Sequence, residues 1–303
     1  MCQRPELLLF TLCRQKHHAL QAGQPFAGAV GHHVSAGRKH RPNLKYNLDY
    51  AHTMLTDPTT LALITATFFI AGLVKGIVGL GLPIVVLAML ATTLGLKTAM
   101  ALFIVPGVAM NLWQATNGPA FRSLLGRFWP FWLAAIVGIL IGTHFLARVD
   151  QAVATLAFGG LLAAYALSRL ANYKVPLPAR SEPFLKPVIG GSAGFIFGAT
   201  GQFMVPGILY LEALGLKRDT FIQALGMTFL IITATLGTGL FANAIMTTEM
   251  AMISMLAIVP SFVGLWLGQS VRRYFSEELF RTILFAWLAI TGVYICGRHF
   301  YFN

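Results

Sequence analysis

Long apolar stretches alternate with short polar gaps along residues 54–303. A helix that crosses the hydrocarbon core of a bilayer needs about 20 mostly apolar residues. Six stretches come close to this length and are predicted as membrane-spanning helices: Ala99–Ala115, Phe128–Ala147, Gln151–Leu170, Thr220–Ala242, Met250–Gln269 and Leu279–Cys296. The pattern therefore predicts an all-α membrane protein that crosses the bilayer several times.

Two further apolar regions are interrupted by glycine and proline. The first run, Thr60–Val74, leads through Lys75, Gly76, Gly79, Gly81 and Pro83 into a second run that ends at Leu94. The other run, Val188–Phe197, leads through Gly198, Thr200, Gly201, Gln202 and Pro206 into a run that ends at Leu214. Glycine permits non-helical backbone and proline removes a hydrogen-bond donor. Lipid does not tolerate such backbone, so each break is expected to be buried in protein or to line a cavity.

Three motifs of the first half recur in the same order in the second half, which argues against chance. Ala71-Gly72-x-x-x-Gly76-x-x-Gly79 has the spacing of Ala193-Gly194-x-x-x-Gly198-x-x-Gly201. Leu94-Gly95-Leu96-Lys97 recurs as Leu214-Gly215-Leu216-Lys217, and Gly138-x-x-x-Gly142 as Gly264-x-x-x-Gly268. The last pair of motifs by itself indicates only close helix packing. Each half is therefore predicted to be a broken pair of short helical arms followed by three full spans.

The predicted organisation has four parts. Residues 54–172 form the first transmembrane repeat, 173–187 a polar linker, and 188–303 the second repeat. Residues 1–53 form a basic extension with the pairs His17-His18 and His32-His33. We interpret it as disordered, or as preceding a true start at Met54, because no regular ligand spacing favours a metal-binding arm.

The basic residues predict how the two halves are oriented. The net charge is +12, but 56% of residues are apolar and only 11% are charged, so the charge indicates topology and not nucleic-acid binding. If each broken pair enters and leaves on one side, only Lys97, Arg148 and Arg298 fall outside. The halves are then inverted repeats, each a re-entrant-type helical hairpin followed by three transmembrane helices. Paired broken helices in inverted halves point to a transporter site near the midplane.

Aromatic residues gather near the start of one predicted span. Trp129, Phe131 and Trp132 follow Arg127. Such clusters are typical of the interfacial belt of membrane helices, and we expect these side chains to lie there.

The two interrupted regions resemble the signature segments of the TauE/SafE family. The similar segments are Ala71–Pro83 and Gly190–Gln202, the second followed by Pro206, and the similarity extends over about residues 58–300. The resemblance implies two duplicated halves, a bacterial inner membrane, and export of sulfite, sulfoacetate and related organosulfur anions. Many members have a run of glycines after the break, which Leu80 and Leu82 interrupt here and Gln202-Phe203 replaces in the second half.

The candidate binding site for a small anion lies at the two breaks. Lys75 is the basic residue with long apolar runs on both sides, and a lysine at membrane depth is a functional candidate. Backbone N–H groups around Gly76–Gly81 and Gly198–Gln202 would complete the site, with Thr200 and Gln202 as further donors. The alternative for Lys75 is a side chain that extends to water at the membrane surface.

Asn111 and Gln114 are predicted to share one face of the span that follows the first break, because they lie three positions apart. They are candidates to line the anion path. The alternative for this pair is ordinary hydrogen bonding between helices.

Other classes of function are weighed by their motifs. The sequence contains no phosphate-binding loop, so a transporter would use an ion gradient or facilitated diffusion. It lacks His-Glu-x-x-His and any acidic pair within a span, so an intramembrane enzyme is disfavoured. A channel-like or structural subunit remains an alternative. The three cysteines form no metal-binding pattern, no cofactor is predicted, and a homodimer is left open.

Overall fold

The computed structural model describes residues 57–171, 182–274 and 277–302. The N-terminal extension with its histidine pairs, the proposed start at Met54 and most of the predicted linker lie outside these ranges. The described chain is helical, and seven helical stretches are long and apolar enough to cross a membrane. They are Pro58–Val78, Leu96–Thr116, Phe121–Arg148, Gln151–Leu170, Arg218–Ala242, Thr248–Val271 and Leu279–Arg298. The expectation of an all-helical, multi-span membrane protein is confirmed.

All six predicted spans are present, and the seventh is the first arm of the first broken pair. The full spans are α5 (Leu96–Thr116), α6 (Phe121–Arg148), α7 (Gln151–Leu170), α10 (Arg218–Ala242), α11 (Thr248–Leu256) joined to α12 (Ile258–Val271), and α13 (Glu277–Phe302). The interruption between α11 and α12 follows from Pro260, whose missing N–H leaves the Leu256 carbonyl without its helical donor.

The first broken pair consists of α3 (Pro58–Val78) and α4 (Leu82–Leu90). Gly79 ends α3 with φ of 86°, a left-handed conformation that glycine adopts without steric cost. Pro83 lies in the first turn of α4, where a missing N–H costs little. The prediction that Lys75 lies at the break is wrong by one turn: Lys75 and Gly76 belong to the last turn of α3.

The second broken pair consists of α8 (Glu182–Thr200), the irregular turn η2 (Met204–Ile208) and α9 (Leu209–Ala213). Gly201, with φ of 75°, separates α8 from η2. Within the predicted linker, α8 already begins at Glu182. Its first turn is stabilised there because the Glu182 carboxylate pairs with Arg127 of α6 at 3.0 Å and with Lys186 at 3.2 Å.

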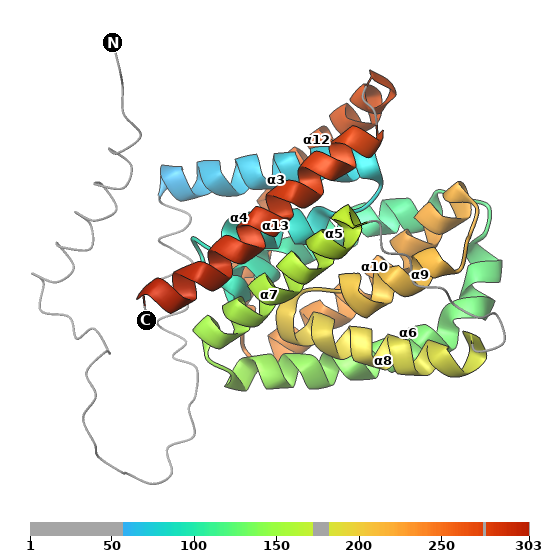
Figure 1. Cartoon of the computed structure of the whole chain (residues 1–303), viewed down its shortest axis with the longest axis horizontal. Coiled ribbons are helices and arrows are strands. Elements are labelled where there is room, and N and C mark those ends of the chain that lie inside the picture. Colours follow the sequence, from blue (N-terminus) through green and yellow to red (C-terminus); the bar gives the residue numbers. More distant parts are fainter. Residues whose placement is uncertain (1–56, 172–181, 275–276, 303) are drawn as a thin grey trace, which may run out of the picture. The chain divides into compact units, whose positions relative to one another are not determined.

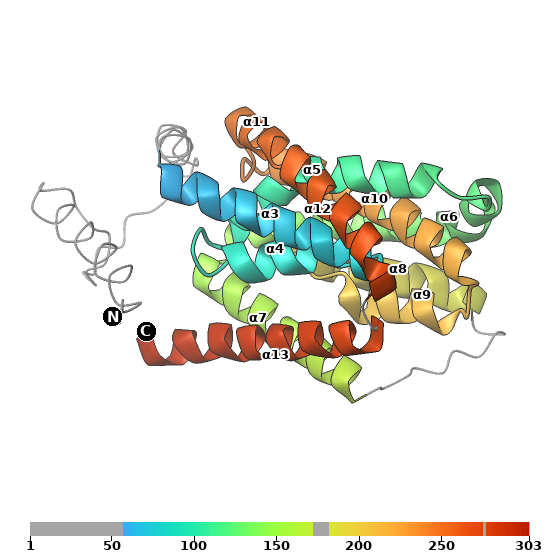
Figure 2. The same ribbon diagram turned by 90° about the horizontal axis from the view of Figure 1, so that it is seen from above.

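The first arm of each half packs against a full span of the other half. Helix α3 pairs with α12, and α8 pairs with α6, while α5 packs on α10 and α7 on α13 (Figures 1 and 2). A methyl group added at Gly72 would overlap the carbonyl of Ser261 in α12, and one at Gly194 would overlap that of Ala135 in α6. The predicted close packing at the Gly-x-x-x-Gly motifs is confirmed, since Gly138, Gly142, Gly264 and Gly268 also touch opposing backbone.

Polar contacts join helix ends in two groups. Near the start of α5, Lys97 donates to the Val149 carbonyl at 3.0 Å, and Arg298 of α13 donates to the Thr92 carbonyl at 3.0 Å. Near the end of α5, the buried Gln223 of α10 donates to the Gly118 carbonyl at 2.9 Å. The second pair is tied down at α9, where Arg169 of α7 binds Glu212 at 2.6 Å.

Candidate functional site

The candidate site is built around Lys75 in the last turn of α3. Its side chain is 6% exposed, and Nζ donates a hydrogen bond to Asn111 Oδ1 of α5 at 2.5 Å. Among the described residues, no carboxylate forms an ion pair with Lys75. The side chain is held inside the bundle by a neutral partner and does not extend to its surface.

The face of α5 that carries Asn111 also holds the first break. One turn beyond Asn111, Gln114 Nε2 donates to the Gly79 carbonyl at 3.2 Å and to the Ile222 carbonyl of α10 at 2.9 Å. The Gly79 carbonyl has no helical donor, because the backbone turns away after Val78. The structure thus brings Lys75, Asn111, Gln114 and Gly79 together. The Gln114 amide satisfies backbone carbonyl groups of the break and of α10.

The remaining residues of the first break serve the turn and the packing. Gly81 has φ of 116° and precedes α4, with Pro83 in the first turn of that helix. Gly76 faces α12, where an added methyl group would overlap the Leu265 carbonyl. Because Gly76 is inside a helix, its N–H group faces an intrahelical carbonyl and not the break.

The residues of the second break form a separate group. Gly198 packs on Ile139 of α6, and the Thr200 hydroxyl donates to the Ile196 carbonyl of its own helix at 2.7 Å. Gln202 is 3% exposed, and its Nε2 has no hydrogen-bond partner among the described residues. Pro206 lies in the turn η2, and Gly201 abuts Leu87 of α4 and Met100 of α5.

The two groups contact α5 at different heights. Gly201 touches Met100, whereas Lys75 binds Asn111, eleven positions further along the same helix. Eleven helical residues rise about 16 Å. A small anion therefore does not span both groups in this arrangement.

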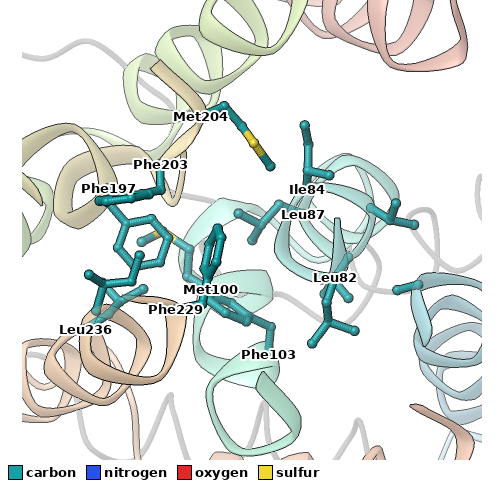
Figure 3. Packing of buried hydrophobic residues seen from close by; sticks show 14 of the residues in the cluster. Leu82, Ile84, Leu87, Met100, Phe103, Phe197, Phe203, Met204, Phe229 and Leu236 are labelled. Carbon is teal, nitrogen blue, oxygen red and sulfur yellow. The ribbon is translucent and has the colours of Figure 1, made fainter. Parts of the chain in front are cut away.

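Apolar side chains fill the region around the second break (Figure 3). The rings of Phe103, Phe197, Phe203 and Phe229 form a chain of edge-to-face contacts, with centroids 5.7 to 6.4 Å apart. Phe197 occupies the motif position that Lys75 occupies in the first half. The two matching motifs therefore differ at this position, with a cation in one and an aromatic ring in the other.

The predicted aromatic belt is only partly correct. Trp129 is 56% exposed, but Phe131 and Trp132 are buried. The Phe131 ring contacts Phe203, and Trp132 donates a hydrogen bond to the Thr228 hydroxyl of α10. The difference arises because α6 packs against both α8 and α10, so only part of its surface faces outward.

Gln223 was not singled out from the sequence. It is fully buried, donates to the carbonyls of Ala115 and Gly118, and accepts from the Ala120 N–H at 2.8 Å. It thereby satisfies backbone groups freed where α5 ends. The available signal was a glutamine inside a predicted span, where an amide needs partners.

Comparison with known protein families gives a match that covers the candidate residues described above. Residues 64–295 match the family model described as "Sulfite exporter TauE/SafE". No curated protein and no solved structure matches the chain. The matched region contains both breaks, and members of the family are membrane transporters and not enzymes. The chain therefore belongs to the sulfite exporter TauE/SafE family.

Proposed function

We propose that this protein is a secondary transporter that exports small anions, such as sulfite or organosulfonates, across the bacterial inner membrane. The observation that carries the proposal is the buried Lys75, which has a neutral hydrogen-bond partner and no carboxylate partner among the described residues. A cation in such surroundings has no negative charge beside it to offset the cost of burial, and a bound anion would supply that charge.

The chemistry of the pair suits a sulfur oxyanion. Because Asn111 Oδ1 accepts from Lys75, the donor group that the Asn111 side chain can offer to an anion is its amide nitrogen. An anion beside Nζ would accept charge-assisted hydrogen bonds from the ammonium and a further one from this amide. Gly79, Gly81 and Pro83 shape the adjoining turn, and the N–H groups of Leu82 and Ile84 in the first turn of α4 offer additional donors.

The second break is proposed as a separate binding position on the route of the anion. Its members are Gly198, Thr200, Gly201, Gln202 and Pro206. The unpaired Gln202 Nε2 supports this assignment, since a buried amide donor without a partner is costly unless a ligand satisfies it.

We further propose that the halves are inverted repeats. The exchange of partners, α3 with α12 and α8 with α6, is the pattern expected of a twofold relation between two halves. The polar contacts add support. Lys97 donates to the Val149 carbonyl near the start of α5. The second broken pair is held by ion pairs, Glu182 with Arg127 and Glu212 with Arg169.

Cysteine labelling tests this topology. In a variant with Cys2, Cys13 and Cys296 replaced by serine, Thr248→Cys should react with a membrane-impermeant maleimide added to intact cells. Asn117→Cys, placed at the other end of the spans, should react only after permeabilisation. Both positions are exposed. Labelling of both from the same side would contradict inverted halves.

Transport itself is tested with the purified full chain in liposomes. Labelled sulfite and a labelled alkylsulfonate should each enter at a rate that saturates with concentration, and each should inhibit the other. Empty liposomes and an unrelated zwitterion such as glycine serve as controls. Saturation and accelerated exchange against internal anion would indicate a carrier, whereas linear flux would favour the channel-like alternative. Absence of anion flux would overturn the proposal.

A further inference from the structure

Among the side chains that the structure describes, none near Lys75 balances a positive charge. Helices α12 and α4, which pack on α3, carry no titratable side chain. On α5 the titratable residue is Lys97, which is bound to the Val149 carbonyl at the start of that helix. Asp219, in the first turn of α10, is exposed and forms no ion pair with Lys75.

Helix α13 also touches α3, and those of its titratable side chains that the structure describes are bound elsewhere or face outward. Arg281 lies over the Phe285 ring, and Arg298 donates to the Thr92 carbonyl. Tyr294 is 57% exposed, and the Cys296 thiol faces the Leu156 carbonyl of α7. Among the described side chains, Lys75 therefore depends on Asn111 alone.

The partner of Lys75 is compatible with two protonation states. A neutral amine and an ammonium both donate a hydrogen bond to an amide oxygen, so the Lys75–Asn111 contact does not require a charge. An unpaired ammonium at membrane depth is penalised, and so is an unpaired anion, whereas the ion pair removes most of both penalties. The proton on Nζ and the anion beside it are consequently expected to stabilise one another.

We propose that Lys75 is neutral in the empty carrier and takes up one proton with each anion, so that the protein co-transports a proton and an anion. This inference rests on the proposed function. On binding, the lone pair of Nζ accepts a proton from water on the side from which the anion comes, and the pair is released together on the other side. With a monovalent anion, the site is electrically neutral both when empty and when loaded.

The proposal fixes what drives the flux. A pH gradient should move a monovalent anion toward the more alkaline side, and membrane potential alone should not. Export by this mechanism is driven by an outward gradient of the anion that exceeds the opposing pH gradient. For one proton per anion, a gradient of one pH unit should support about tenfold accumulation of the anion, because both ratios correspond to the same free energy.

The test uses methanesulfonate, whose charge is constant over the pH range, so that any proton movement belongs to the protein. Liposomes that contain the purified full chain are clamped at zero potential with potassium and valinomycin, and pyranine inside reports pH. An acidic exterior should drive concentrative methanesulfonate uptake with one internal proton per anion. A potential imposed at equal pH should drive none.

Lys75→Arg provides a matched variant. Arginine keeps its charge throughout this pH range, so any anion flux that this variant retains should carry no proton. Potential-driven anion flux without proton movement in the wild type would overturn the coupling and leave the proposed function standing. The same coupling is overturned if Lys75→Arg still moves protons with the anion. Failure of the wild type to carry anions under any gradient would remove the proposed function, and this inference with it.

Discussion

Replacing Lys75 with methionine should lower the initial rate of anion uptake by about a hundredfold or more. Placing a charge at membrane depth costs about 2.5–3.5 kcal/mol on insertion scales, and the variant cannot offset this cost for the anion. With about 1.4 kcal/mol per factor of ten, the loss reaches two decades. The measurement is the initial rate of labelled sulfite uptake into liposomes that contain equal amounts of folded protein.

The same variant should fold as well as the wild type. Methionine is apolar and similar in length to lysine, and it suits a position that is 6% exposed. The buried Asn111 Oδ1 loses the hydrogen bond from Lys75, and this cost is offset because an amine that is expensive to bury is removed as well. Thermal unfolding in detergent should therefore change little. Lys97→Met is the matched control, because Lys97 binds a carbonyl at a helix end and should influence transport weakly. Full transport by Lys75→Met would discard the anion site.

Replacing Gly194 with leucine should prevent recovery of folded protein. Gly194 faces α6 so closely that even a Cβ atom would overlap the backbone of Ala135. Overpacking typically costs about 1–3 kcal/mol, and more where backbone must move. Because α8 and α6 meet along much of their length, separating them would displace the second broken pair as a whole.

Gly160→Leu is the control for this substitution, because nothing lies within 4 Å of a Cβ built there. Both variants add the same side chain to a helix, so their difference isolates the packing of α8 on α6. Size-exclusion chromatography and thermal unfolding in detergent report the outcome. If the two variants were equally stable, the α6–α8 contact would not be what holds the second pair.

The sequence by itself determined the membrane class, the spans and the family. Span lengths follow from local hydrophobicity, because a bilayer requires a fixed length of apolar helix whatever its neighbours. Thus α7 begins and ends where predicted, whereas α6 begins seven residues before the predicted Phe128 and α13 ends six residues beyond the predicted Cys296. The motifs at the two breaks were sufficient to indicate the family that the comparison bears out.

The exact position of each break was decided by tertiary structure. Positions 76 and 79 are both glycine, yet Gly76 continues α3 and Gly79 ends it. The two glycines differ in their neighbours. Gly76 lies against the backbone of α12, whereas the Gly79 carbonyl accepts a hydrogen bond from the Gln114 amide of α5.

Side-chain partners across helices were likewise beyond the local pattern. Lys75 meets Asn111, 36 residues away in sequence, and Phe131 is buried where a position in the interfacial belt was expected. Hydrophobicity fixes which segments enter the membrane, but it is nearly the same on a face that meets lipid and on one that meets another helix. Only the packing of the helices therefore decides that the lysine is buried beside an amide, about 16 Å along α5 from the second break.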